Sequence, residues 1–295
     1  MPKILVIGEA GQLARSLDRL HWPAKCDLTF LGRRHLPGGA PAAGIGAVLE
    51  AGKPSLVLNT AAYTAVDRAE SEPEAAAALN VALPRALAEA CGALDIPLVH
   101  VSTDYVFDGE KRSPYLETDA PSPLNVYGAT KLEGDLAIER ASPRRWAILR
   151  TSWVVSEIGE AFPVKLLRRA KAGEPLRVVD DQWGCPTATS DLARAMQTVG
   201  TRLLDGDAAA IGLFNFRGAT EMSWHGFAER LLSAAEEAGL ARPSLQAIKS
   251  ADLNAPARRP AYSVLSCARI LQTLGIAGAK IEDEIERMVR TILSA

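Results

Sequence analysis

The chain has 295 residues, of which 48% are hydrophobic and 23% are charged, and its formal net charge is −2. This near-neutral charge offers no basic face for nucleic acid, and no apolar run approaches the roughly 20 residues that span a membrane. The first apolar run is too short for a secretion signal, and the four cysteines form no Cys-x-x-Cys pair. We therefore expect a reduced cytoplasmic protein that binds neither nucleic acid nor membrane. The four histidines lack metal-ligand spacing, so no metal site is predicted.

The N-terminal half alternates short apolar runs with Ala- and Leu-rich segments. The apolar runs predict strands and the segments between them predict helices. The expected strands cover 3–7, 28–31, 56–58, 97–101 and 146–150, and the expected helices cover 12–20, 41–51, 73–91 and 124–140. This alternation predicts a doubly wound α/β (Rossmann) fold, with a parallel sheet covered on both faces. Because ligands bind at the carboxyl ends of such strands, the segments at Gly8, Thr60 and Ser102 should meet in one crevice.

A glycine-containing turn follows the first expected strand directly. It reads Gly8-Glu9-Ala10-Gly11-Gln12-Leu13-Ala14. Glycines allow a tight turn and a close approach of the backbone to a pyrophosphate at a helix N-terminus. A plain strand-to-helix turn is the alternative, but the position between the first strand and first helix favours a dinucleotide site at Gly8, Gly11, Gln12 and Leu13.

The end of the second strand indicates which dinucleotide is bound. An NAD site usually places an acidic residue about 20 positions after the glycine turn. Here no Asp or Glu lies between Leu28 and Val48, and the strand runs into Arg33 and Arg34. A guanidinium suits a 2′-phosphate, so we expect NADPH rather than NADH, with a solvated basic loop as the alternative.

Small side chains follow the third strand. Ala61 and Ala62 would let a cofactor lie against the backbone. The next two residues, Tyr63 and Thr64, could line the nicotinamide side or could equally be capping or packing residues.

A phenol and an ammonium lie four residues apart at the start of the 124–140 helix. Tyr127 and Lys131 share one helix face, and Lys131 is expected to lower the pKa of the phenol. A hydroxyl from Thr103 or Ser102 could hold the substrate oxygen that Tyr127 protonates. An amphipathic helix start with an exposed Lys is the alternative. The order of glycine turn, Ser-Thr strand end and Tyr-x-x-x-Lys favours a carbonyl reductase.

Longer motifs occur along nearly the whole chain. They are NTAAYTAVDRAESE at 59–72, STDYVFDG at 102–109, PLNVYGATKLEG at 123–134, RTSWV at 150–154, DQWGCPT at 181–187 and PARRPAYSVL at 256–265. On these motifs the sequence resembles the dTDP-4-dehydrorhamnose reductases, a family of the extended short-chain dehydrogenase/reductase superfamily. The resemblance implies NADPH-dependent reduction of the C4 keto group of dTDP-4-dehydro-6-deoxy-L-mannose to dTDP-L-rhamnose.

The resemblance also implies roles for single residues. Tyr127 would be the proton donor, Lys131 would bind the ribose and lower the phenol pKa, and Thr103 would hydrogen-bond the substrate. The sugar nucleotide would contact Asp104, Tyr105 and Trp153. The implied cofactor contacts are Gly11, Gln12, Leu13, Ala62, Tyr63 and Thr64.

The resemblance leaves the metal requirement and the oligomeric state open. Some members of the family bridge a homodimer with Mg²⁺ held by glutamates. Here Ser16 occupies the first-helix position expected for such a ligand, and no acidic cluster is evident. The sequence leaves Mg²⁺ and a homodimer open without assigning a site.

The alternation loosens in the C-terminal part. We expect helices at 162–172, 190–204, 223–238 and 281–293, a strand at 211–216 and a loop at 252–262, with Ser190 and Ser223 as N-caps. We expect an NADP-binding domain at 1–150, to which 175–210 returns, and a mainly sugar-nucleotide domain at 151–295.

Two side-chain types in this part suit a nucleotide sugar. Arg258 and Arg259 could bind the diphosphate, with a surface salt-bridge pair as the alternative. Three tryptophans, Trp153, Trp183 and Trp224, could stack on the sugar or the thymine, although core packing is the safer prediction for any one of them.

Two rival functions remain at this stage. An epimerase or dehydratase of the same superfamily would keep NAD⁺ bound through its cycle, and Asp104 could serve as the acid of a dehydratase. A non-catalytic NADP-binding regulatory subunit is the rival from another class. Intact Thr103, Tyr127 and Lys131 disfavour the second rival.

Overall fold

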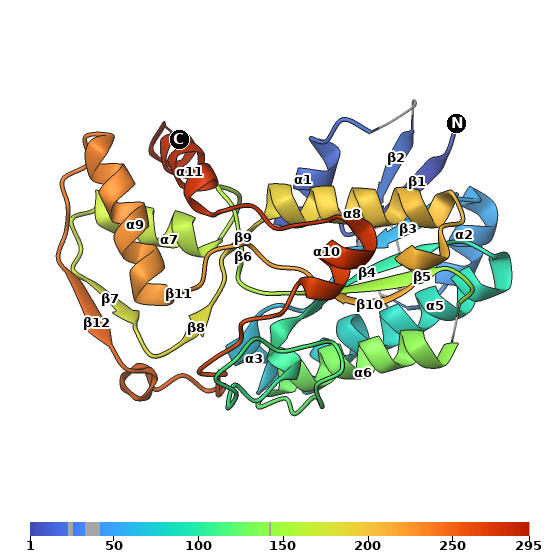
Figure 1. The fold of residues 1–295 in the computed structure, drawn as a ribbon, viewed down its shortest axis with the longest axis horizontal. Coiled ribbons are helices and arrows are strands. Elements are labelled where there is room, and N and C mark those ends of the chain that lie inside the picture. The colour runs from blue at the N-terminus through green and yellow to red at the C-terminus, as the bar shows by residue number, and fades with distance from the viewer. Residues whose placement is uncertain (23–25, 33–41, 142, 295) are drawn as a thin grey trace.

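Six parallel strands form the central sheet in the order β10-β5-β4-β3-β1-β2 (Figure 1). The computed structural model describes residues 1–22, 26–32, 42–141 and 143–294. The strands are β1 (Lys3–Ile7), β2 (Asp27–Leu31), β3 (Leu56–Asn59), β4 (Leu98–Thr103), β5 (Trp146–Thr151) and β10 (Gly212–Asn215). All five strand pairings are parallel. The predicted doubly wound fold is therefore confirmed.

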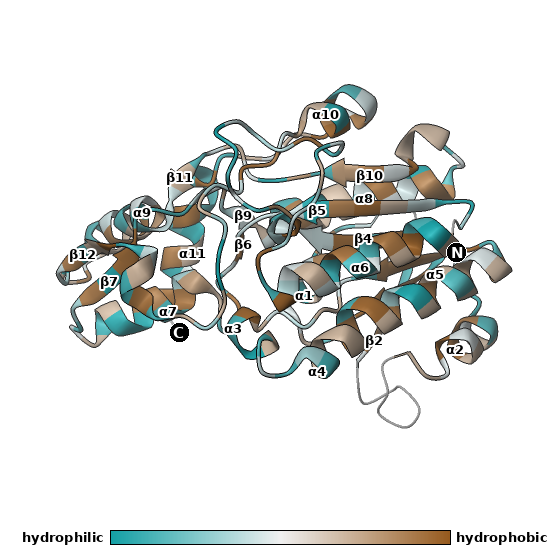
Figure 2. Cartoon of the chain, turned by 90° about the horizontal axis from the view of Figure 1, so that it is seen from below, coloured by the Kyte–Doolittle hydropathy of each residue, from teal (hydrophilic) through white to brown (hydrophobic). Residues whose placement is uncertain are grey.

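Helices cover both faces of this sheet because its strands are apolar on both sides. One face carries α1 (Gln12–Asp18) and α8 (Thr189–Leu204), which pack with α10 (Ala268–Leu274) around Leu17, Met196 and Phe214. The opposite face carries α2 (Ile45–Gly52), α5 (Leu83–Leu94) and α6 (Val126–Ala141). Figure 2 shows hydrophobic residues concentrated along β4 and β5, between the two helix layers.

The predicted helix at 73–91 is three consecutive pieces. They are α4 (Pro73–Ala77), a π-helical turn (Ala78–Ala82) and α5. The wider π turn places Asn80 fully inside, where its Oδ1 accepts from the backbone N of Tyr63 at 2.8 Å and its Nδ2 donates to Thr130 Oγ1 at 3.1 Å. A local change of helix type thus connects the segment after β3 to α6. A short helix, α3 (Val66–Ala69), precedes α4.

The second core lies beside the sheet and is built from later segments (Figures 1 and 2). It comprises the helices α7 (Phe162–Lys171), α9 (Trp224–Glu237) and α11 (Glu282–Ser294) and the parallel pair of β7 (Leu176–Val179) and β12 (Leu245–Ile248). Four two-residue strands complete the connections: β6 (Val154–Val155) pairs with β9 (Thr187–Ala188), and β8 (Trp183–Gly184) pairs with β11 (Met222–Ser223). Because α8, β10 and α10 pack on the first core, the chain crosses between the two units several times. The expected domain boundaries stay predictions.

The two predicted N-caps have opposite outcomes. Ser223 caps α9, since its Oγ accepts from the backbone N of Gly226 at 3.0 Å, which confirms the prediction. The prediction for Ser190 is wrong: α8 begins at Thr189 after Ala188, and Ser190 Oγ donates to Glu284 Oε1 at 3.1 Å. Ser190 therefore lies inside the first turn of α8, and its hydroxyl connects this helix to α11. Within the described ranges, no helix has the length and apolar character needed to cross a membrane.

Candidate active site

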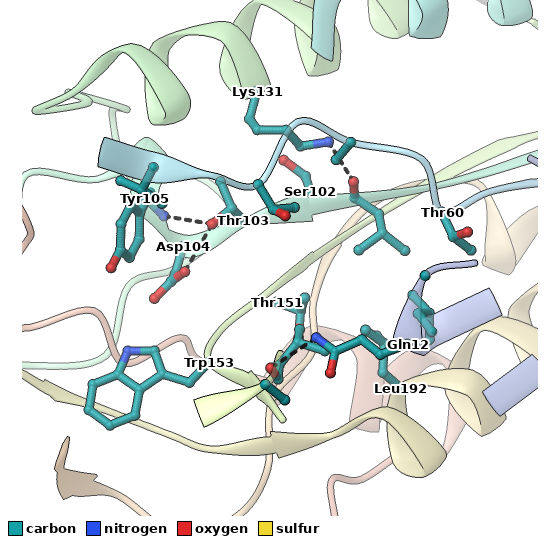
Figure 3. Close-up of a pocket in the computed structure, with 18 of the residues that line it drawn as sticks. Gln12, Thr60, Ser102, Thr103, Asp104, Tyr105, Lys131, Thr151, Trp153 and Leu192 are labelled. Atoms are coloured by element: carbon teal, nitrogen blue, oxygen red, sulfur yellow. Dashed lines mark hydrogen bonds between the residues drawn. The ribbon is translucent and has the colours of Figure 1, made fainter. Parts of the chain in front are cut away.

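A cavity of about 490 Å³ lies at the carboxyl ends of the central strands and reaches the second unit (Figure 3). The segments at Gly8, Thr60 and Ser102 converge as predicted, and residues from all three segments line the cavity. The lining also includes side chains from α6, from the segment after β5 and from α7 and α9. The lining includes Gly11, Gln12, Leu13, Thr60, Ala62, Thr64, Ser102, Thr103, Asp104, Tyr105, Tyr127, Lys131, Trp153, Phe162 and Trp224.

The turn after β1 has the conformation that requires glycine. Gly8 has φ 109°, and a Cβ at this position would lie 2.5 Å from Thr60 Oγ1. Gly11 is exposed, and a Cβ there would meet no atom within 4 Å. Gln12 then bridges the two halves of the cavity, because its Nε2 donates to Val154 O at 3.3 Å and its Oε1 accepts from Ser156 Oγ at 2.7 Å.

The predicted cofactor residues after β2 and β3 have different outcomes. Arg33 and Arg34 lie outside the described residues. Ala62 and Thr64 line the cavity, whereas Tyr63 is not among the lining residues. The Tyr63 hydroxyl donates to Glu72 Oε2 at 2.5 Å, and this hydrogen bond is the main cause of the raised pKa of Tyr63. Ala61 is half-buried and its backbone N donates to Asn59 Oδ1 at 3.2 Å.

Thr103 ends β4 and presents its hydroxyl beside Tyr127. Its Oγ1 donates to Asp104 Oδ1 at 3.0 Å and accepts from the backbone N of Tyr105 at 3.2 Å (Figure 3). The other candidate hydroxyl, Ser102, donates to Asp135 Oδ2 at 2.8 Å. Both hydroxyls are therefore engaged by buried carboxylates, and Thr103 is the one that also lies within hydrogen-bonding reach of Tyr127.

The expected lowering of the Tyr127 pKa is wrong for this structure. The pKa of Tyr127 is raised to about 12, mainly because burial disfavours the phenolate. A hydrogen bond with Thr103 lowers it, whereas Asp104 and Asp135 raise it. Sequence reasoning counted the neighbouring cation and missed both the burial and the two carboxylates. A phenol with this pKa carries its proton at neutral pH.

Lys131 is buried, with 1% of its surface exposed. Its Nζ donates to Val101 O at 2.7 Å and lies 3.0 Å from His100 Nε2. Burial lowers the pKa of Lys131 to about 8, opposed by the charge of Asp135. Burial, together with Lys131, lowers the pKa of His100 well below its usual value. Sequence reasoning missed His100, although a histidine inside an apolar strand was the available signal.

A buried ion pair supports the wall formed by β4 and α6. Arg150 Nε lies 3.1 Å from Asp135 Oδ2, and both side chains are at most 4% exposed. The guanidinium of Arg150 also lies over the ring of Phe107, 5.5 Å from its centroid. Neither Arg150 nor Asp135 was predicted as a site residue, because 15 residues separate them and no sequence motif indicates that they pair.

The predicted substrate residues nearest the chemistry do line the cavity. Asp104 is 2% exposed, and burial raises its pKa to about 7, against hydrogen bonds from Ser263 and Thr103 that lower it. Tyr105 packs edge-on against Tyr127 at 5.7 Å between ring centroids. Burial, followed by the charge of Asp104, raises the pKa of Tyr105.

Trp153 forms the wall opposite Ser102 and Lys131 (Figure 3). Its ring stacks on Trp224 with 3.8 Å between centroids and 7° between planes. The stack requires a glycine beneath it, because a Cβ at Gly184 would lie 2.5 Å from Trp153 Cε2. Trp153 itself has φ 44°, in the left-handed region. Trp183, which is 45% exposed, is not among the lining residues.

The structure does not bring the predicted diphosphate ligands into this cavity. Arg259 Nη2 lies 2.8 Å from Asp67 Oδ2, and its Nη1 donates to Ala257 O at 3.1 Å. Arg258 is exposed and lines, together with Arg259, a separate cavity of about 280 Å³. Their predicted role in binding the diphosphate stays a prediction.

The expected metal position is also occupied by neutral groups. Ser16 is buried, and its Oγ donates to Thr189 Oγ1 at 2.7 Å. Among the residues that the structure describes, no group of three or more His, Cys, Asp or Glu could hold a metal ion.

Comparison with known proteins agrees with the motifs and the geometry. The family described as RmlD substrate binding domain matches residues 2–294. A dTDP-4-dehydrorhamnose reductase from Sinorhizobium fredii is 40% identical over 292 residues, covering 99% of this chain and 98% of the relative. The solved structure of a dTDP-4-dehydrorhamnose reductase from Clostridium acetobutylicum has a TM-score of 0.89 at 30% identity, covering 99% of this chain and 100% of that one.

A second solved structure adds a ligand. The dTDP-4-dehydrorhamnose reductase from Bacillus anthracis in complex with NADP has a TM-score of 0.88 at 28% identity, covering 98% of this chain and 99% of that one. The match extends along both units of the fold and includes the segments that form the cavity. The chain therefore belongs to the dTDP-4-dehydrorhamnose reductase family.

Proposed function

We propose that this protein is an NADPH-dependent reductase that converts the C4 keto group of dTDP-4-dehydro-6-deoxy-L-mannose to the hydroxyl of dTDP-L-rhamnose. The observation that carries the proposal is the meeting of Thr103, Tyr127 and Lys131 in the cavity that the glycine turn after β1 also lines. The relatives' names supply the substrate, and the Bacillus anthracis complex supports NADP as the cofactor.

The turn after β1 fits a dinucleotide. Gly8 is sterically required against Thr60, and Gly11 leaves the backbone open in front of α1. A pyrophosphate needs this close backbone approach. The residues that would hold the cofactor are Gly11, Gln12, Leu13, Ala62, Thr64 and Lys131, and the bound cofactor supplies the hydride. The preference for NADPH through Arg33 and Arg34 stays a prediction.

Tyr127 and Thr103 act on the carbonyl oxygen. Because its pKa is about 12, the Tyr127 phenol holds a proton that it can donate as negative charge develops on that oxygen. The backbone N of Tyr105 fixes Thr103 Oγ1 beside the phenol, and the hydroxyl proton that now points to Asp104 would have to turn toward the carbonyl oxygen to hold it. We assign Tyr127 as the proton donor and Thr103 as the group that holds the oxygen.

The sugar nucleotide would lie against the aromatic wall. Trp153 and Trp224 offer a flat apolar surface that faces the hydroxyl groups of β4 and α6. Arg259 does not line the cavity, whereas Trp153 and Asp104 do, so we propose Trp153 and Asp104 as the stronger candidates for substrate contact.

The decisive assay is nucleotide consumption by the purified protein with the keto sugar, which an upstream dehydratase and epimerase generate from dTDP-glucose. We expect rapid NADPH oxidation with formation of dTDP-rhamnose, slower oxidation of NADH, and no change on adding a chelator. Binding of NADPH without consumption would overturn the reductase and favour the regulatory subunit. Purification with tightly held NAD⁺ that is not consumed would favour an epimerase or dehydratase. The homodimer stays a prediction, for which sedimentation is the test.

A further inference from the structure

The glutamate of the glycine turn lies against the end of the second strand. The strands β1 and β2 pair in parallel with Ile7 beside Leu31, and the backbone N of Gly8 donates to Leu31 O at 2.9 Å. The chain continues to Glu9 after β1 and to Gly32 after β2. A Cβ at Gly32 would overlap Glu9 Oε2 and would lie 3.0 Å from Glu9 Cβ. The Glu9 carboxylate therefore occupies the space into which a side chain at position 32 would project.

The closeness of Glu9 explains the glycine at position 32. Gly32 is buried, and its φ lies outside the left-handed region, so its backbone conformation does not require glycine. The three atoms that a Cβ there would meet first all belong to Glu9. In a doubly wound fold, an acidic residue near the end of β2 usually binds the ribose hydroxyls of NAD. In this chain that position has no side chain, and a carboxylate from the preceding turn lies in its place.

The order of the strands determines which half of a dinucleotide reaches this carboxylate. The glycine turn follows β1, which lies between β3 and β2 in the sheet. The cavity extends from this turn past β3 to Tyr127 and Lys131 beside β4, which is the side where the nicotinamide reacts. The adenosine half of an extended dinucleotide must then lie on the other side of the turn, toward the end of β2. This is the side on which Glu9 lies.

A carboxylate discriminates between the two nicotinamide cofactors at the 2′ position of the adenosine ribose. It accepts hydrogen bonds from the ribose hydroxyls of NADH, and it repels the 2′-phosphate of NADPH. Glu9 is half-buried, so water and salt screen its charge less than they screen a fully exposed carboxylate. Its effect on the two affinities should therefore be measurable.

We propose that Glu9 is a specificity-determining residue of the dinucleotide site. It takes the place of the acidic residue that β2 lacks, binds the adenosine ribose and limits the preference for NADPH, so that NADH stays a usable cofactor. This inference rests on the proposed function. It concerns the ratio of the two affinities and not the identity of the better cofactor.

The first test is direct binding of NADPH and NADH to full-length Glu9→Gln, followed by the fluorescence of the reduced nicotinamide. Glutamine keeps the size of the side chain and one oxygen acceptor but removes the charge. We expect the ratio of the NADH Kd to the NADPH Kd to rise by about tenfold or more, because one nucleotide gains what the other loses. Glu50→Gln, which removes an exposed carboxylate on α2, is the matched control and should leave the ratio unchanged. An unchanged ratio in Glu9→Gln would overturn the proposal.

The second test moves the carboxylate from the turn to the strand. Glu9→Gly removes every side-chain atom that a new Cβ at position 32 would meet, and Gly32→Asp then supplies a carboxylate from β2. We expect Glu9→Gly alone to weaken NADH binding and strengthen NADPH binding, and the double variant to return the Kd ratio toward the wild-type value. A double variant that keeps the ratio of Glu9→Gly would contradict the proposal.

Both tests measure binding and not turnover, which separates this proposal from the proposed function. A protein that shows the expected shifts in affinity but oxidises neither nucleotide would support the role of Glu9 and refute the reductase. Failure of the wild-type protein to bind either nucleotide would overturn both.

Discussion

The two walls of the cavity are built in different ways. The wall formed by β4 and α6 consists of buried polar groups, each held by a hydrogen bond or ion pair within a few ångströms. The facing wall consists of aromatic rings from distant segments of the chain: Trp153 stacks on Trp224, and Phe162 packs at a tilt against Trp224. Hydrogen bonds fix directions and protonation states, whereas stacking fixes mainly a surface. We therefore expect changes in the polar wall to affect turnover or folding, and changes in the aromatic wall to affect substrate affinity.

The largest effect, a loss of turnover, is expected for Tyr127→Phe in the polar wall. Loss of a general acid typically costs about 10²- to 10⁴-fold in rate, while binding of NADPH should be retained. Steady-state kinetics and a fluorescence titration with NADPH measure the two effects. Tyr105 is a neighbouring phenol that lines the same cavity, and Tyr105→Phe should lose much less turnover than Tyr127→Phe. Near-normal turnover of Tyr127→Phe would end its assignment as proton donor.

Arg150→Met tests whether the polar wall also holds the fold. It leaves Asp135 buried without its cation, which is expected to cost about 3–5 kcal/mol of unfolding free energy. Urea denaturation measures this loss. Asp135 Oδ1 and Arg150 Nη1 have no hydrogen-bond partner among the described residues. The double variant Arg150→Met with Asp135→Leu should therefore recover much of the stability, and a further loss would contradict this account.

Gly184→Ala perturbs the aromatic wall without touching the polar one. The new Cβ would meet Trp153 at 2.5 Å and displace its ring from Trp224. A displaced ring that loses about 1–2 kcal/mol of substrate binding would raise KM roughly five- to thirty-fold, with kcat nearly unchanged. Gly46→Ala on α2, where a Cβ meets nothing within 4 Å, is the matched control. A fall in kcat at constant KM would mean that the two walls are not separable in this way.

The smallest effect, a slight loss of stability, is expected for Asp67→Asn on α3. The hydrogen bond from Arg259 is the main cause of the lowered pKa of Asp67. A carboxyl with a lowered pKa stabilises the fold at pH values above its unfolded-state pKa of about 3.9. This contribution disappears as the pH falls through the pKa of the folded state. Because the Asp67 side chain is 43% exposed, the loss at neutral pH should stay below about 1 kcal/mol.

Stability curves of wild type and Asp67→Asn should therefore converge in acid. Glu174→Gln, which removes a pair that is half exposed on both sides, provides the baseline for a surface salt bridge. Curves that stay parallel down to acidic pH would show that Asp67 acts through its shape rather than its charge.

Contiguous stretches of the sequence were enough to predict much of this molecule. The apolar runs predict β1 to β5 within a few residues, because a strand buried on both faces must be apolar throughout. The glycine turn, the Ser-Thr strand end and the spacing of Tyr127 and Lys131 are equally local. Since the carboxyl ends of parallel strands meet at one edge, these local signals sufficed to place the cavity.

The tertiary structure alone decided the protonation states and the partners. His100 meets Lys131 across 31 positions, and Arg259 meets Asp67 across 192, so no spacing rule connects them. The pKa of Tyr127 is raised rather than lowered because burial and two carboxylates outweigh what its neighbour in sequence suggests. Local pattern specifies which elements form and where their ends converge. Long-range burial specifies what each side chain contacts there, and therefore which chemical form it adopts.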